Sequence, residues 1–128
     1  QVSPMSGDAV PQVVAFLKER QAALVQQGMS ADRIVLDPGI GFGKTVEQNF
    51  SLLARQQELA AWAPVLAGWS RKSALGAVTG WPAQQRQLPS VLAAVMAVER
   101  GAALVRVHDV AASVAAINTA VKLSEEER

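Results

Sequence analysis

The sequence contains no cysteine and no tyrosine, and it has a single histidine. Without cysteine, the chain has neither a disulfide framework nor a metal site built from thiolates. An excess of one charge is also lacking, because 12 Lys and Arg stand against 11 Asp and Glu. That balance gives no indication of a nucleic-acid surface. There is no apolar run of about 18 residues, the length of a membrane span, and no signal-peptide pattern. We expect a cytoplasmic protein that binds neither nucleic acid nor membrane.

What the sequence does contain is an alternation of short apolar segments with longer helical patterns. Its 128 residues are 50% hydrophobic, as in a single globular domain. Strands are predicted at 34–36, 65–68 and 104–107, and helices at 9–27, 45–61, 90–100 and 111–123. Strands with few polar residues, each followed by a helix, predict an α/β fold with a parallel sheet. Strand-to-strand steps of roughly 30 to 40 residues fit a barrel or a doubly wound sheet.

The segment that follows the first strand, Asp37-Pro38-Gly39-Ile40-Gly41-Phe42-Gly43-Lys44-Thr45, predicts a ligand site. Three alternating glycines let the backbone turn sharply and come close to a bound molecule. The segment is not a complete P-loop, because Pro38 stands where the first glycine belongs. It is not a dinucleotide fingerprint either, because Lys44 takes the place of the third glycine.

Polar side chains follow all three predicted strands, and parallel strands present their carboxyl ends at one edge. These side chains are Asp37 after the first strand, Ser70 and Lys72 after the second, and Arg106 and His108 after the third. Two groups that carry positive charge, two residues apart, suit a phosphate or pyrophosphate. A carboxylate accepts two parallel hydrogen bonds from a guanidine-like N–C–N edge. We therefore expect one shared pocket.

Each of these residues also has a structural interpretation. Asp37, before Pro-Gly, is a residue type that often caps a turn, and a single histidine at a strand end is often only hydrogen-bonded. Arg71 points away from its neighbours in the alternation, and Lys44 is interpreted as stabilising its own loop. The presence of Arg106 beside His108 favours the functional interpretation of the pair.

Three blocks together resemble dihydropteroate synthase: the segment 37–44, Ser70-Arg71-Lys72-Ser73, and Arg106-Val107-His108-Asp109-Val110. That family has a (β/α)8 TIM barrel about twice as long as this chain. The resemblance implies that residues 1–123 form the carboxyl-terminal half of such a barrel, of the pterin-binding type, with a polar tail at 124–128. A half barrel leaves strand edges open, so we expect a piece of a longer protein, a homodimer, or pairing with the missing amino half.

The resemblance also implies an activity, which is a transfer reaction of folate biosynthesis. The family condenses 6-hydroxymethyl-7,8-dihydropterin pyrophosphate with 4-aminobenzoate to give 7,8-dihydropteroate and pyrophosphate. Magnesium accompanies the pyrophosphate, and sulfonamides compete with aminobenzoate. The metal ligand is expected in the missing amino half, and none in this half. We therefore expect this chain alone to be inactive.

Roles carried over from the family fall on eight positions of this sequence. The pterin would contact Asp37, Lys72, Gly68, Met5 and Arg106; aminobenzoate would contact Ser70 and Phe42; pyrophosphate would contact Arg106 and His108. Lys72, Arg106 and His108 would be the catalytic residues. The bottom-up assignment of a carboxylate to the heterocycle and of cations to the pyrophosphate agrees with these roles.

Departures from the family pattern leave two alternatives open. The family usually has His-Met-x-Gly where this chain reads Pro4-Met5-Ser6-Gly7, and the chain begins at Gln1 without an initiator methionine. The first alternative is a pterin-binding methyltransferase module, which has a similar carboxylate. The second is a non-catalytic remnant or interaction domain.

Overall fold

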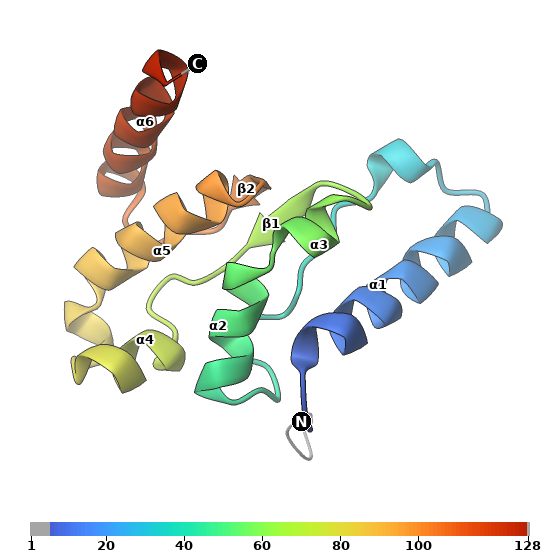
Figure 1. Ribbon diagram of the computed structural model, residues 1–128, viewed down its shortest axis with the longest axis horizontal. Helices are drawn as coiled ribbons and strands as arrows, with labels where there is room; N and C mark the ends of the chain where they lie inside the picture. The colour runs from blue at the N-terminus through green and yellow to red at the C-terminus, as the bar shows by residue number, and fades with distance from the viewer. Residues whose placement is uncertain (1–5, 128) are drawn as a thin grey trace.

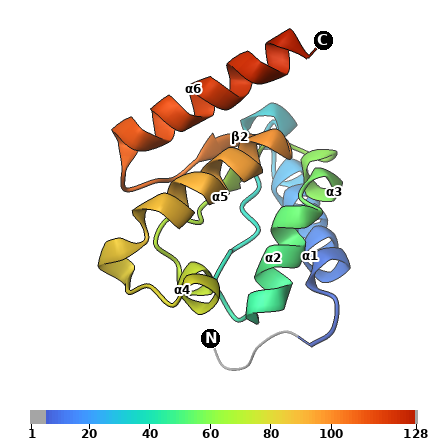
Figure 2. The same cartoon turned by 60° about the vertical axis from the view of Figure 1, so that its left-hand side comes forward.

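The computed structural model describes residues 6–127. In chain order the elements are α1 Ala9–Gln26, η1 Ala31–Arg33, α2 Val46–Ala54, α3 Gln57–Ala60, β1 Val65–Ala67, α4 Ser73–Thr79, η2 Ala83–Gln85, α5 Gln87–Glu99, β2 Ala102–Val105 and α6 Val110–Glu126. Helices α1 and α6 lie at opposite ends of the molecule (Figure 1), and α6 packs beside α5 (Figure 2). None of the described helices combines the length and apolarity of a membrane span.

The strands form a small parallel sheet at the centre of the molecule. β1 and β2 pair in parallel, and Leu36 forms an isolated parallel bridge to Val65. The predicted strand 34–36 is thus reduced to one bridge; Val35, within it, is 45% exposed. The predicted strand 104–107 is also wrong in its bounds, because β2 ends at Val105. The described chain is a helix-rich α/β structure with two parallel strands.

The helices also differ from the prediction in number and in bounds; α5, for example, begins at Gln87 instead of 90. The predicted helix 45–61 is broken between α2 and α3, where buried Gln56 donates to the carbonyls of Ala97 and Arg100 at the end of α5. α4 was not predicted. The predicted polar tail is helical as far as Glu126, which forms an ion pair with Lys122 one turn earlier, at 2.8 Å.

The start of α2 is set by a capping box, which the Thr45-x-x-Gln48 spacing in the sequence also indicates. The Thr45 hydroxyl accepts from the Gln48 backbone N–H at 3.1 Å, and the Gln48 side chain accepts from the Thr45 N–H at 2.9 Å. The two bonds satisfy donors that have no partner within the helix. The box fixes the point at which the glycine-rich segment joins α2.

Thr45→Ala is expected to lower the free energy of unfolding by about 1 kcal/mol, because the side-chain half of the box is lost. Urea unfolding followed by circular dichroism measures the change. Thr119→Ala is the control, because the Thr119 hydroxyl bonds to the Ala115 carbonyl within exposed α6 and caps nothing. Equal losses in both variants would contradict the capping role.

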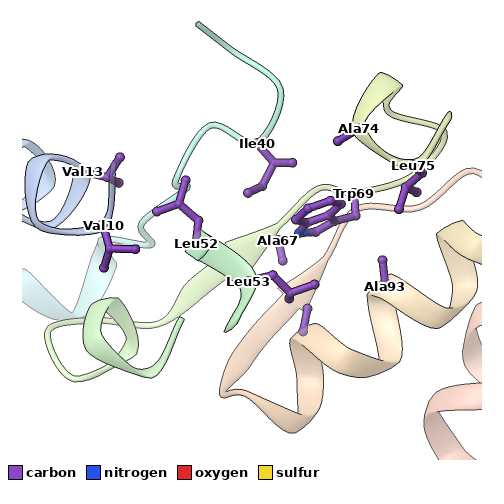
Figure 3. Packing of buried hydrophobic residues seen from close by; sticks show 11 residues of the cluster. Val10, Val13, Ile40, Leu52, Leu53, Ala67, Trp69, Ala74, Leu75 and Ala93 are labelled. Carbon is purple, nitrogen blue, oxygen red and sulfur yellow. The ribbon is translucent and has the colours of Figure 1, made fainter. Parts of the chain in front are cut away.

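The core lies between the sheet and helices α1, α2, α4 and α5. Trp69 is 2% exposed and packs with Leu53, Ala67 and Leu75 (Figure 3). Its ring lies 4.9 Å from that of Phe50 in α2. Large aromatic side chains contribute much of the buried area of a core. Burial of Trp69 therefore fixes the backbone directly before Ser70.

Candidate functional site

The loops that follow β1 and β2 enclose a small cavity. It measures about 140 Å³ and is lined by Gly68, Ser70, Lys72, Arg106, Val107 and His108. The structure thus brings together every side chain predicted at these two strand ends. Because β2 ends at Val105, Arg106 and His108 belong to the following loop, and the period-two argument does not explain their shared direction. Val107 was not predicted as a lining residue.

The guanidinium of Arg106 lies close to the backbone at Gly68. A Cβ atom on Gly68 would be 2.6 Å from Nη2 of Arg106 and 3.1 Å from Cζ. The backbone of Gly68 does not have a positive φ, so the requirement for glycine comes from this close approach. The absence of a side chain at Gly68 is what lets the guanidinium sit over the cavity.

Gly68→Ala is therefore expected to displace the Arg106 guanidinium without removing its charge. A moved guanidinium loses part of its interaction with an anion, and we expect roughly tenfold weaker pyrophosphate binding, equivalent to about 1.4 kcal/mol. Calorimetric titration measures the affinity. The free energy of unfolding is expected to change little, because the end of a flexible side chain moves at low cost. Unchanged affinity in a folded Gly68→Ala variant would contradict this explanation.

Lys72 reaches from the cavity toward the glycine-rich segment. Its ammonium donates to the Ile40 carbonyl and lies 4.7 Å from the centre of the Phe42 ring. Burial lowers the pKa of Lys72, the nearby positive charge of Arg106 lowers it further, and Asp37 opposes both effects. Phe42 itself is 60% exposed. Lys72 is thus the residue that connects the cavity electrostatically with Asp37.

Asp37 lines a different cavity. This second cavity, of about 300 Å³, is bounded by Asp37, Pro38, Gly39 and Lys44 and by Val13, Phe16 and Leu17 of α1. Asp37 and the residues after β1 and β2 thus line two different cavities, and Asp37 acts electrostatically on Lys72, which lines the smaller one. That all three strand ends share one ligand stays a prediction. The segment 34–36 is held by only one bridge, which is why its end is not set by a regular strand.

The carboxylate of Asp37 makes the turn-capping contact that its sequence context indicated. Oδ1 accepts from the Gly39 N–H at 2.8 Å. Lys44 stabilises the same loop, because its ammonium donates to the carbonyls of Gly39 and Phe42 at 2.8 and 2.9 Å. Burial lowers the pKa of Lys44, and Asp37 opposes that effect. One oxygen of Asp37 thus orders the loop, and the carboxylate still has acceptor capacity for a ligand.

Ser70 and His108 form a direct pair across the cavity. The Ser70 hydroxyl lies 2.7 Å from Nδ1 of His108 and also accepts from the His108 backbone N–H at 3.1 Å. Ser70 is buried, whereas His108 is exposed to the cavity side. The sequence contains no signal for this contact, because 38 residues separate the two side chains.

Arg71, between the two lining residues Ser70 and Lys72, is the one described non-glycine residue with a positive φ, at 58°. Three contacts hold that conformation. Its N–H donates to the buried Ser90 hydroxyl at 2.7 Å, its carbonyl accepts from Arg86 at 2.9 Å, and its guanidinium pairs with Asp109 at 3.2 Å. Sequence reasoning missed Arg86 and Ser90. These residues fix the turn that directs Ser70 and Lys72 into the cavity.

Two further expectations concern Met5 and a metal ion. Met5, expected in the pterin site, lies outside the described residues. Within residues 6–127 there is no group of three or more His, Asp or Glu side chains that could hold a metal ion. The magnesium ligand stays an expectation for the missing amino half.

The sequence of this chain is similar to those of known enzymes. Residues 1–108 match the family described as pterin binding enzyme. The chain is 42% identical over 114 residues to the dihydropteroate synthase of Haemophilus influenzae, covering 88% of this chain and 42% of that protein.

Solved structures of synthases agree with the sequence match. The Burkholderia cenocepacia dihydropteroate synthase complexed with 7,8-dihydropteroate has a TM-score of 0.90 and 48% identity, over 98% of this chain and 49% of that one. The Yersinia pestis enzyme, solved with a sulfonamide drug complex, has a TM-score of 0.92 and 37% identity, over 98% and 46%. The chain therefore spans less than half the length of these three proteins.

Proposed function

We propose, from the premise that this chain belongs to the pterin-binding enzyme family and is a homologue of dihydropteroate synthase, that it forms the carboxyl-terminal half of a (β/α)8 barrel. In that arrangement it supplies the pyrophosphate site and part of the pterin and aminobenzoate sites. The observation that carries the proposal is the cavity that Lys72, Arg106 and His108 share with Ser70 and Gly68. Two side chains there are cationic, and the third becomes so on protonation.

The proposed reaction is the condensation of 6-hydroxymethyl-7,8-dihydropterin pyrophosphate with 4-aminobenzoate. Negative charge develops on the pyrophosphate oxygens as the bond to the pterin methylene breaks. Arg106 and His108 are already in place at that position and stabilise the transition state more than the ground state. Lys72 assists by donating to the pterin ring oxygen. Burial lowers the pKa of Lys72, and the nearby positive charge of Arg106 lowers it further.

Asp37 is proposed to recognise the pterin. Its carboxylate offers two oxygens to the N–C–N edge of the aminopyrimidine, with the Gly39 N–H holding Oδ1 in place. Ser70 and Phe42 are proposed for aminobenzoate, and Met5 and Gly68 for the wall of the pterin site. The Burkholderia protein was solved with 7,8-dihydropteroate, which joins the two substrate groups in one molecule.

Isothermal titration of this chain with pyrophosphate and with 6-hydroxymethylpterin tests the binding roles. Binding of both supports the synthase half. Binding of a methylfolate in their place would favour the pterin-binding methyltransferase, and binding of none would favour a non-catalytic remnant.

Catalysis by the whole barrel needs a separate assay. The chain alone is expected to form no dihydropteroate from the two substrates. Mixing it with the amino-terminal half of the Burkholderia enzyme is expected to restore product, inhibited by a sulfonamide and dependent on added magnesium. Product from the chain alone would contradict the proposed division of the site between two halves. The same proposal includes a homodimer, or pairing with the missing amino half, and a cytoplasmic location.

A further inference from the structure

The hydrogen bonds of Ser70 constrain which nitrogen of His108 carries the proton. A serine hydroxyl has one hydrogen to donate and two lone pairs with which to accept. The backbone N–H of His108 occupies one lone pair of Ser70, at 3.1 Å. The second contact, to Nδ1 at 2.7 Å, then has two possible directions.

If the hydroxyl donates to Nδ1, both the hydroxyl hydrogen and the Nδ1 lone pair have a partner. The hydroxyl accepts once and donates once, and the neutral imidazole carries its hydrogen on Nε2. If instead Nδ1 donates to the hydroxyl, Ser70 accepts twice and its own hydrogen needs another acceptor. The described residues provide no other hydrogen-bond partner for that hydroxyl. Because Ser70 is only 9% exposed, a hydrogen without a partner there is costly.

We infer that Ser70 is a positioning residue that fixes the neutral tautomer of His108, so that Nε2 presents an N–H to the cavity. This role deepens the proposed pyrophosphate site and rests on that proposal for its function. A histidine held in this tautomer donates to an anion even before it is protonated. The neighbouring charged groups on the same cavity are Lys72 and Arg106, and Asp109, next in the chain, is paired with Arg71.

The hydrogen bond to His108 also restricts when Ser70 is able to donate to the carboxylate of aminobenzoate. While the Ser70 hydroxyl donates its hydrogen bond to Nδ1, it cannot donate to a carboxylate. Once His108 is protonated, both ring nitrogens are donors, Nδ1 donates to Ser70, and the hydroxyl hydrogen is released toward the cavity. Protonation of His108, favoured by a bound anion, thus makes a donor available for the second substrate.

The single histidine of the chain makes the test direct, because nitrogen-15 spectra of the imidazole contain one residue only. Spectra are recorded at about pH 9, where free imidazole is neutral, on the folded chain and on the same chain unfolded in urea. The folded chain is expected to show only the Nε2-protonated form, with Nδ1 as a hydrogen-bonded acceptor. The unfolded chain is expected to show the mixture typical of free imidazole. The same mixture in both states, or Nδ1 protonated in the folded chain, would overturn the inference.

Substitutions at position 70 test whether the hydroxyl itself fixes the tautomer of His108. Folded Ser70→Ala is expected to return His108 to the mixture of the unfolded chain, whereas Ser70→Thr, which keeps the hydroxyl, is expected to retain the single form. Ser73→Ala is the matched control, because exposed Ser73 begins α4 and makes no contact with His108 in the described chain. A folded Ser70→Ala variant with an unchanged spectrum would overturn the role. If that variant does not fold, the wild-type comparison still decides.

Adding pyrophosphate to the wild-type chain distinguishes this inference from the proposed function. A single tautomer in the free chain, with no response to pyrophosphate, supports the role of Ser70 and contradicts the pyrophosphate site. A mixture in the free chain overturns the role of Ser70 whatever pyrophosphate does.

Discussion

Asp37→Asn is expected to weaken binding of 6-hydroxymethylpterin by about 100-fold, equivalent to about 2.8 kcal/mol. The amide replaces one carboxylate oxygen by NH2, which sets a donor against a donor of the pterin edge. The remaining oxygen is still able to accept from the Gly39 N–H, as Oδ1 of Asp37 does at 2.8 Å. The loop is therefore expected to keep its turn while the ligand contact is lost. Isothermal titration measures the affinity, and thermal unfolding measures the stability.

Asp32→Asn is the matched control for this experiment. Asp32 lies in η1, before the 34–36 segment, whereas Asp37 directly follows that segment. Its carboxylate accepts from the Ser30 hydroxyl within an exposed turn. The two variants change charge in the same way, so a loss of affinity in Asp37→Asn alone assigns the effect to position. Unchanged affinity in Asp37→Asn would remove Asp37 from the pterin site.

Local sequence signals predicted the parts of the structure that depend on neighbours in the chain. Thr45 and Gln48 form their capping box because both partners lie within one turn. Asp8, directly before α1, accepts from the Val10 N–H, which is likewise a contact between neighbours in the chain. The parallel pairing of two predicted strands also followed from the alternation of apolar segments with helices.

The parts that failed depend on contacts between distant segments. A continuous helix over 45–61 satisfied the local pattern, but Gln56 instead bonds to carbonyls at the end of α5, more than 40 residues away. The segment 34–36 has the apolar character of a strand, yet only one bridge joins it to β1. Pairing partners, rather than side-chain type alone, decide whether such a segment becomes a strand.

Some features of the candidate site were likewise predicted from the sequence, and others depend on contacts between distant segments. Residue type and position at the strand ends predicted the side chains that line the cavity after β1 and β2, and the resemblance gave the same residues. Neither predicted the left-handed backbone of Arg71 or the Ser90 hydroxyl that holds it. Ser90 was expected to start a helix, but α5 begins earlier, at Gln87, which leaves the Ser90 side chain available for this contact. Contacts of this kind require the tertiary structure to be known.

Arg106→Leu is expected to weaken pyrophosphate binding by on the order of 10- to 100-fold, because a charge-assisted donor is lost from the cavity. The matched control is Arg33→Leu, since Arg33 lies in η1, before the 34–36 segment, and lines a different cavity. Both variants remove one positive charge and one long side chain. An equal loss in both would show a general charge effect and would contradict a specific site.

The same variant has a second expected result, at Lys72. The positive charge of Arg106 is one of the causes that lower the pKa of Lys72, so its removal is expected to raise that pKa. Burial, the larger cause, remains, and the pKa is not expected to return fully to its ordinary value. An NMR titration of the Lys72 side chain measures the direction, and an unchanged titration would contradict the electrostatic contact. Gly68→Ala moves the Arg106 guanidinium but keeps its charge, so comparing the two variants separates the position of that charge from its presence.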